Sequence, residues 1–478
     1  MNADTRAVNG IKWTSASVIL KALLQLSQLI ILVRLLDKSD FGIMAILIFF
    51  ISFCQVFVDF GISKSIIYHQ DISRKELGAL YFINILFGFL TYAVLFLIAG
   101  YISDFYSEPL LCGYLRLIGL ILIIQSFGLQ FDVLFQKSLK FNIIAKIEII
   151  SAFASFLSAI IMGINGLGVL ALIYSAIIMT AVKASMLMFW GIKAYGLQLI
   201  FTIKYIRRHV VFGVYIVSNA MISNISSQID TILVGKFMGS EVLGLYSVLK
   251  ELILRPSQII SPIVTKVSFP LMSELNYDLM AVKLMYMKII NYISSILFPL
   301  YVITIIFAKE IILIFLGAKW LDGVVIFQIL AIWAMLYSIS DPVGCLIMAV
   351  GRPDISMYWS IAGLFYMPMV IYISSFFGQL GIALGMLIIS ILLYIPAWYF
   401  LVYRLCGATL KEYFHGSLSS IYISAIVGIS LYFIIQFLPN ILYLRLFIGL
   451  IAGIMLSLFL NKILNKDFYN SVLSLFRK

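Results

Sequence analysis

Long, predominantly apolar runs constrain this chain more than any other feature of its sequence. Residues 18–36 and 41–58 are two examples, and each is long enough to cross a lipid bilayer as a helix. Of the 478 residues, 63% are apolar and 11% are charged, and the mean hydropathy is +1.10. A soluble domain carries about 25% charged residues. These values exclude a water-soluble globular enzyme and a disordered chain, and they predict a polytopic membrane protein.

Fourteen such segments follow one another along the chain. A transmembrane β-barrel would instead show strands of about ten residues with alternating polarity, so we expect an all-α protein. Short loops join the segments, and no soluble domain is inserted between them. We expect membrane-spanning helices at about 11–34, 41–67, 77–100, 112–135, 143–163, 168–195, 209–235, 243–270, 283–308, 322–350, 355–376, 380–405, 416–438 and 442–461.

The basic residues predict the orientation of these segments. With the N-terminus placed in the cytoplasm, 22 Lys and Arg fall on the cytoplasmic side and 6 on the opposite side. Basic loops favour the cytoplasmic face, so we expect both termini there. The net charge of +12 then reflects loops that face anionic lipid headgroups, and we expect no nucleic-acid partner.

Catalytic and metal-binding motifs are missing from the sequence. The four cysteines and three histidines show no spacing typical of a disulfide, a metal site or a catalytic triad. There is no glycine-rich phosphate loop and no nucleophile elbow. We therefore expect a protein that is not an enzyme and that carries no cofactor. The first apolar run lacks a cleavage site, so we expect it to remain as span one.

One cytoplasmic connection divides the chain into two lobes. Residues 195–210 are amphipathic and end in Arg207-Arg208-His209, which is typical of an interfacial helix. The predicted organisation is an N-lobe at 1–195 with spans one to six, a cytoplasmic amphipathic linker at 196–208, a C-lobe at 209–405 with spans seven to twelve, and spans thirteen and fourteen with a cytoplasmic tail at 406–478.

The two lobes resemble each other in sequence. Residues 31–44 run through Ile31-Leu32-Val33-Arg34 to Phe41-Gly42, and about 201 residues later 232–246 run through Ile232-Leu233-Val234-Gly235 to Leu243-Gly244. One inserted residue aligns the two segments, so span one would correspond to span seven and span two to span eight. Structural repeats of this kind are common in secondary transporters, although apolar runs can also resemble each other by chance.

Polar side chains form a stripe on the first two spans of each lobe. A stripe keeps to one helical face when its members are three or four residues apart. Such stripes either form hydrogen bonds between packed helices or line a shared polar cavity. Four of them, on the first two spans of each lobe, favour the cavity. The stripes are Thr14, Ser17, Lys21, Gln25 and Gln28; Ser52, Gln55, Asp59 and Ser63; Asn219, Ser223, Ser226 and Asp230; and Glu251, Arg255, Gln258, Pro262 and Thr265.

Charged residues inside the spans are the strongest candidates for a functional site. Those nearest the expected membrane centre are all cationic, namely Lys21, Lys183 and Arg255. Glu251 and Arg255 are four residues apart and could satisfy each other, whereas Lys21 has no acidic residue within a turn of its own helix. Ion pairing or cation coupling remains open for the acidic residues Asp59, Asp230, Glu251 and Asp341.

Several short motifs resemble those of one transporter family. They are Leu35-Leu36-Asp37-Lys38-Ser39-Asp40-Phe41-Gly42, Asp59-Phe60-Gly61, Asp230-Thr231-Ile232-Leu233-Val234-Gly235, Leu243-Gly244-Leu245-Tyr246, Arg255-Pro256, Phe269-Pro270-Leu271-Met272 and Ala349-Val350-Gly351-Arg352-Pro353-Asp354. In their order, over nearly the whole chain, the motifs resemble the polysaccharide transport family of the multidrug/oligosaccharidyl-lipid/polysaccharide flippase superfamily, in particular its Wzx-type, colanic-acid exporter-like flippases.

That resemblance implies a fold, a substrate and a location. It implies two six-helix lobes in a V with two further C-terminal helices, in the bacterial cytoplasmic (inner) membrane. The substrate would be an oligosaccharide repeat unit of an O-antigen or exopolysaccharide on a polyprenyl pyrophosphate, moved from the cytoplasmic to the periplasmic leaflet. The partners would be the lipid bilayer and other polysaccharide assembly proteins. Lys21 and Arg255 match the family's cationic cavity residues in kind, and Lys183 matches in depth alone. Gln25 and Gln258 lie on the same stripes as Lys21 and Arg255. The expected substrate contacts are therefore Lys21, Gln25, Lys183, Arg255 and Gln258.

Two other functions stay open at the level of the sequence. A cation-coupled drug or small-molecule antiporter of the same superfamily would have the same spans but would favour acidic residues at mid-membrane. A membrane glycan polymerase or ligase would need a large extracytoplasmic loop with catalytic groups, and the outer loops here are short.

Overall fold

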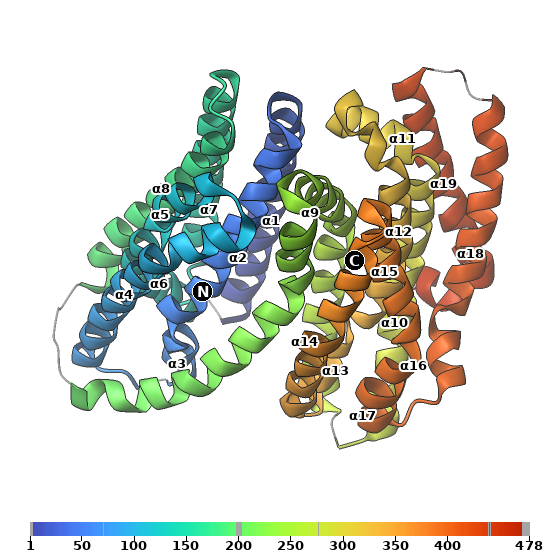
Figure 1. Ribbon diagram of the computed structural model, residues 1–478. Helices are drawn as coiled ribbons and strands as arrows, with labels where there is room; N and C mark the ends of the chain where they lie inside the picture. The colour runs from blue at the N-terminus through green and yellow to red at the C-terminus, as the bar shows by residue number, and fades with distance from the viewer. Residues whose placement is uncertain are drawn as a thin grey trace. The chain divides into compact units, whose positions relative to one another are not determined.

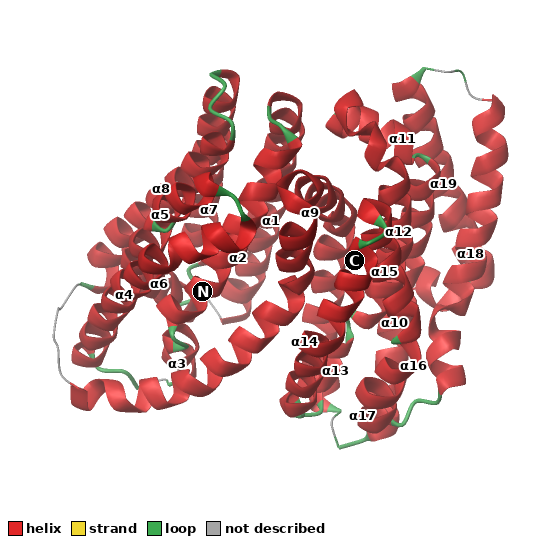
Figure 2. Cartoon of the chain, viewed as in Figure 1, coloured by secondary structure: helices red, strands yellow, loops and turns green. Residues whose placement is uncertain are grey.

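The structure is a computed structural model that describes residues 3–69, 71–196, 203–275, 277–437, 439 and 441–470. Within these ranges every regular element is a helix, as Figures 1 and 2 show. The chain divides into two compact units, Met1–Gly244 and Leu245–Lys478. The long helix α9 (Ile203–Glu274) begins in the first unit and continues into the second.

The first unit contains eight complete helices and the beginning of α9. The helix pairs that pack most extensively are α7 with α8, α1 with α7, α6 with α8 and α4 with α6. A capping box begins α4, where Ser73 and Glu76 bond each other's backbone N–H groups at 2.8 and 3.2 Å. The helices are α1 (Ala3–Leu35), α2 (Lys38–Asp59), α3 (Ile62–Tyr68), α4 (Arg74–Tyr106), α5 (Pro109–Ile118), α6 (Leu120–Lys137), α7 (Phe141–Ile164) and α8 (Val169–Tyr195).

The second unit is built around α10, which packs against α12, α18 and α19. Two of its elements are π-helical and one is a 3₁₀-helix. After α9, the elements are α10 (Leu279–Ile306), α11 (Ala308–Ile311), the π-helix η1 (Ile312–Leu316), the 3₁₀-helix η2 (Ala318–Gly323), α12 (Val324–Ser340), α13 (Val343–Ala349), α14 (Pro353–Ser375), α15 (Gly378–Leu392), α16 (Tyr394–Ala397), the π-helix η3 (Trp398–Tyr403), α17 (Arg404–Cys406), α18 (Leu410–Phe437) and α19 (Leu442–Leu464).

Many of these helices are long and apolar enough to cross a membrane. Twelve pass that test in the described part of the chain, and a pair bent by 44°, Gly378–Leu392 with Tyr394–Cys406, would add a thirteenth. The stretch Val217–Thr265 of α9 has 49 residues, more than twice the roughly 20 that a bilayer needs. Gly239, with φ 81°, interrupts its helical geometry. Counting each side of Gly239 separately gives the fourteen expected spans, and the predicted all-α polytopic fold is confirmed.

Two glycines bring α2 and α9 into direct backbone contact. A Cβ atom at Gly42 would lie 1.8 Å from the carbonyl oxygen of Ser240, and one at Gly244 would lie 1.7 Å from that of Lys38. Only a residue without a side chain fits at either position. The contact is reciprocal, because the same offset in the sequence relates Lys38 to Ser240 and Gly42 to Gly244. This symmetry supports the internal repeat inferred from the sequence.

Serine and asparagine side chains tie the last two long helices to α10. The hydroxyl of Ser420 on α18 lies 2.9 Å from that of Ser294 and 3.1 Å from that of Ser295. Asn465, directly after α19, donates to the Ser295 hydroxyl at 2.8 Å and to Asn291 Oδ1 at 3.1 Å. Polar contacts of this kind hold helices together where lipid gives no hydrophobic driving force between them.

Part of the predicted domain organisation lies outside the described residues. The linker expected at 196–208 includes 197–202, and the tail includes 471–478, neither of which is described. The division into an N-lobe, a linker and a C-lobe therefore stays a prediction. The part of α9 up to Gly244 belongs by its contacts to the first unit.

Candidate functional site

Lys21 and Gln25 lie one turn apart on α1, within the span Ala16–Leu35. Both side chains are half-buried. Among the residues that the structure describes, neither has a hydrogen-bonding or ion-pairing partner. An ammonium group in an apolar span is costly unless water, a counter-ion or a ligand neutralises it. The α1 stripe therefore has the properties expected of a ligand contact.

Lys183 is placed differently. Its ammonium group on α8 lies 3.1 Å from a carboxylate oxygen of Asp132 on α6. The Lys183 side chain is 33% exposed and that of Asp132 is 14% exposed. The positive charge is already balanced by a carboxylate, so a substrate-binding role for Lys183 has to compete with this pair.

The α2 stripe is bonded to neighbouring helices. Gln55 donates to Oε1 of Gln125 on α6 at 3.0 Å, and Gln228 on α9 donates to the hydroxyl of Ser52 at 3.1 Å. These side chains hold helices together, as one of the two sequence interpretations expected. Sequence reasoning did not single out Gln125 and Gln228, because their partners are 70 and 176 residues away in the chain.

Asp59 and Asp230 have surroundings of different kinds. The Asp59 carboxylate accepts hydrogen bonds from the backbone N–H of Ser63, at 3.2 Å, and from its hydroxyl. Between them Phe60 and Gly61 take left-handed conformations, with φ 44° and 70°. Asp59 thus bridges the turn between α2 and α3 and stabilises the first turn of α3. Asp230, on α9, is only 2% exposed.

In the second unit, Arg255 pairs with Glu251 one turn earlier on α9. This is the i, i+4 pairing that the sequence left open. The Arg255 side chain is 24% exposed and that of Glu251 is 45% exposed. The Nε atom of Arg255 is buried and has no hydrogen-bonding partner within the described chain. One edge of the guanidinium is therefore satisfied while its Nε–H donor is left over.

The remaining candidates of the second unit are more exposed. Gln258 follows Arg255 on α9 and is exposed, and Asp341 is exposed directly after α12. Sequence reasoning gave no role to Lys250, whose ammonium group lies 5.5 Å from the ring centre of Tyr246 and 5.8 Å from that of Trp333. Such rings stabilise a cation. The i−4 spacing of Tyr246 was readable in the sequence, whereas Trp333 comes from a different helix.

Some of the predicted residues meet within one unit, and others belong to different units. Arg255 and Glu251 meet, whereas Lys21 with Gln25 and Arg255 with Gln258 belong to different units. Across the described ranges, no group of three or more His, Cys, Asp or Glu side chains is placed to hold a metal ion.

Comparison with known proteins places the chain among polysaccharide biosynthesis proteins. The model of the family described as "Polysaccharide biosynthesis protein" matches residues 31–325, which is more than half of the chain. The chain belongs to this family. The lipopolysaccharide biosynthesis protein WzxC of Escherichia coli (strain K12) is 25% identical over 439 residues, covering 90% of this chain and 89% of WzxC. The teichuronic acid biosynthesis protein TuaB of Bacillus subtilis (strain 168) is 27% identical over 425 residues, covering 88% of this chain and 87% of TuaB.

Solved structures share the fold of this family member. The lipid II flippase MurJ, in an inward closed conformation, superposes with a TM-score of 0.76 at 15% identity, covering 96% of this chain and 99% of MurJ. An inward-facing multidrug resistance transporter of the MATE family, from the MOP superfamily, gives a TM-score of 0.63 at 12% identity, covering 81% of this chain and 95% of that transporter. The predicted resemblance to a polysaccharide transport family is confirmed by the family model, the predicted fold is confirmed by these structures, and the protein is a multi-pass membrane protein.

Proposed function

We propose that this protein is a flippase that moves a polyprenyl-pyrophosphate-linked oligosaccharide repeat unit from the cytoplasmic to the periplasmic leaflet by alternating access. The repeat unit would belong to an O-antigen or an exopolysaccharide. The observation that carries the proposal is the match to WzxC over about nine-tenths of both chains. The fold shared with the flippase MurJ along almost the whole length supports it.

The physical chemistry of the candidate residues suits this substrate. Sugars and a pyrophosphate cannot enter hydrocarbon without a large desolvation cost, so they need a polar path, while the polyprenyl tail can stay in lipid. Within the described residues, Lys21 offers an ammonium group without a partner, and Arg255 keeps its Nε–H donor unused. Both groups are strong donors to phosphate oxygens. Gln25 and Gln258 lie one turn or less further along and could hydrogen-bond the oxygens of the headgroup.

The same proposal includes the location and the character of the protein. It would lie in the bacterial cytoplasmic (inner) membrane with both termini in the cytoplasm, and it would act as a transporter without catalysis. The balance of 22 against 6 basic residues supports the orientation. The acidic residues Asp59, Asp230, Glu251 and Asp341 are proposed to form ion pairs or to couple transport to a cation.

The alternative functions have weaker support. A drug antiporter is represented by the MATE structure, which covers less of this chain than MurJ does. None of the relatives or solved structures named above is described as a glycan polymerase or ligase.

Deleting the gene in the source organism distinguishes between these functions. We expect the mutant to lose its surface glycan and to accumulate lipid-linked repeat units, and the gene in trans to restore both. A mutant with normal glycan and altered drug resistance would favour the antiporter.

A further inference from the structure

A cavity in the second unit has none of the candidate transport residues among the described residues that line it. Its volume is about 680 Å³, and it lies between the beginning of α14 and the π-helix η3 with α17. Charged and aromatic side chains dominate its wall. The residues that matter here are Arg352, Asp354, Tyr358, Trp359, Phe400 and Arg404.

We propose that this cavity binds the phosphodiester headgroup of an anionic phospholipid, with Arg404 as its principal contact. Arg404 is exposed and has no carboxylate partner among the described residues. Its guanidinium lies over two rings, 5.3 Å from the centre of Tyr399 and 5.0 Å from that of Phe400. The two rings stabilise the cation, and its N–H groups can donate to phosphate oxygens.

The charge of the cavity selects among phosphate compounds. Arg352 forms a two-pronged pair with Asp354, with Nε–Oδ1 and Nη2–Oδ2 distances both 2.9 Å. These hydrogen bonds and the carboxylate charge raise the pKa of Arg352 above its ordinary value, so the pair stays ionised and neutral overall. Arg404 then leaves one net positive charge. A monoanionic phosphodiester matches it, whereas a pyrophosphate carries more negative charge and would meet Asp354 at the same place.

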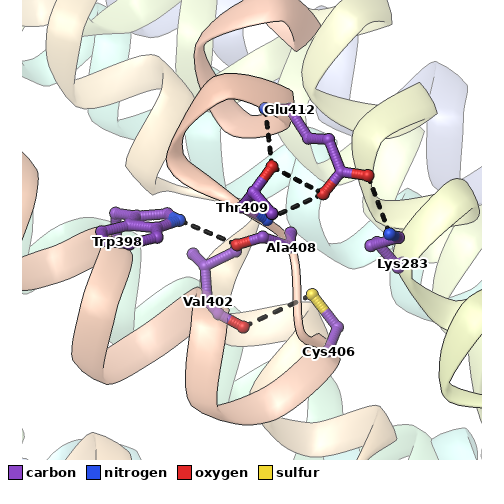
Figure 3. Close-up of polar contacts among 7 residues, drawn as sticks. All are labelled: Lys283, Trp398, Val402, Cys406, Ala408, Thr409 and Glu412. Atoms are coloured by element: carbon purple, nitrogen blue, oxygen red, sulfur yellow. Dashed lines mark hydrogen bonds and ion pairs between the residues drawn. The ribbon is translucent and has the colours of Figure 1, made fainter.

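The wall that carries Arg404 is held in place by its own bonds. The span containing η3 is broken, with a bend of 44°, and π-helical turns occur frequently at functional sites. Trp398 donates from its indole nitrogen to the carbonyl of Ala408 at 2.9 Å, and the Cys406 thiol bonds the carbonyl of Val402 at 3.4 Å, as Figure 3 shows. Both bonds anchor the turn on which Arg404 lies.

The acyl chains of such a lipid could pack along one face of α14. Tyr358, at the cavity, is followed on the same face of α14 by Phe365, Met369 and Tyr372, which lie 7, 11 and 14 residues further along. All four side chains are more than half exposed. The helix offers lipid an apolar stripe that leads away from the charged cavity. Basic pockets beside membrane helices are typical phospholipid sites on the cytoplasmic side, which is where the expected topology puts Arg352 and Arg404.

Lipid binding to the purified full-length protein tests this proposal. We would delipidate the protein in detergent, add dioleoyl phosphatidylglycerol or phosphatidylethanolamine, and count retained lipids by native mass spectrometry while following thermal unfolding. We expect phosphatidylglycerol to stay bound and raise the melting temperature, and phosphatidylethanolamine to do neither. Arg404→Gln should weaken phosphatidylglycerol binding about tenfold, since one charge-assisted contact is lost. Lys411→Gln, an exposed basic residue outside the cavity, should leave it unchanged.

A second variant keeps the test valid if Arg404→Gln folds poorly. Among the described residues of the cavity wall Asp354 is the only carboxylate, so Asp354→Asn should tighten phosphatidylglycerol binding. Inorganic phosphate and undecaprenyl pyrophosphate serve as competitors. Each should displace the bound phospholipid only at concentrations higher than those at which added phosphatidylglycerol displaces it. Equal binding by Arg404→Gln and wild type, weaker binding by Asp354→Asn, or displacement by undecaprenyl pyrophosphate at lower concentrations would each overturn the proposal.

Discussion

At the scale of single residues, a cation that pairs with a carboxylate differs in its expected role from a cation that has no such partner. Lys183 has its carboxylate in Asp132, and Arg255 shares its charge with Glu251. Lys21 has no such partner within the described residues. A charge left in an apolar span without a counter-charge is retained for function more readily than for stability. Lys21 is therefore the residue on which the proposed transport role depends most.

Replacing Lys21 by Gln should impair export more than stability. The loss of one charge-assisted contact costs about 1.5–3 kcal/mol, so we expect surface glycan to fall at least about tenfold at equal protein levels. Lys21→Arg keeps the charge and should recover part of the activity. Surface glycan and membrane-bound protein would be measured in a strain that lacks the chromosomal copy. Normal glycan in Lys21→Gln cells would remove Lys21 from the substrate site.

The Glu251–Arg255 pair allows a second test at this scale. If Arg255 only neutralises Glu251, then Glu251→Gln combined with Arg255→Gln removes both charges together and should export glycan almost normally. We expect a severe defect instead, because the double variant also loses the Nε–H donor that Arg255 holds unused. The same strain and glycan assay apply, with immunoblots of the membrane fraction to show that the protein is inserted. Near-normal export would show that Arg255 does not bind substrate.

At the scale of helices, the Gly42–Gly244 contact is the most restrictive. α2 and α9 approach so closely there that a Cβ at either glycine would collide with backbone oxygen. Residues related by the repeat meet each other, so a single local two-fold arrangement accounts for both glycines. The Phe41-Gly42 and Leu243-Gly244 dipeptides therefore recur for reasons of packing.

A methyl group at this contact should destabilise the protein. Overpacking of this kind costs about 1–3 kcal/mol, so Gly42→Ala should lower the melting temperature of the purified protein in detergent. Gly100→Ala is the matched control, because Gly100 lies in α4 with nothing within 4 Å of its added Cβ. The control should be neutral or slightly stabilising, since alanine favours helix. A Gly42→Ala variant as stable as Gly100→Ala would contradict the close contact.

The sequence predicts the helices better than it predicts their polar contacts. Apolar length alone locates the spans, because the bilayer sets that length. The Glu251–Arg255 pair was readable because its members are one turn apart. Lys183 and Asp132 belong to different helices, as do Gln228 and Ser52, and spacing within one helix carries no information about such pairs. The cap formed by Asp59 was likewise hidden, because it depends on a left-handed turn at Phe60.

At the scale of the whole molecule, the orientation in the membrane is open to direct measurement. The basic-residue bias places Lys411 in the cytoplasm and Ala318 outside, and both residues are exposed. In a Cys112→Ser, Cys345→Ser background, we expect an impermeant thiol reagent to label Ala318→Cys in intact cells. Lys411→Cys should react only after the cells are permeabilised. The reverse pattern would overturn the proposed topology.

Lipid flipping by the purified protein is the central claim, and proteoliposomes test it most directly. Vesicles would contain the protein and the polyprenyl-pyrophosphate oligosaccharide isolated from the deletion strain, and an added glycosidase that cannot cross the membrane would digest exposed sugar. The account predicts that wild-type vesicles lose nearly all of the glycan, whereas protein-free vesicles stop at the outer-leaflet half and Lys21→Gln vesicles pass that half at least about tenfold more slowly than wild type. Digestion that stops at half in wild-type vesicles, with the protein folded and inserted, would contradict it.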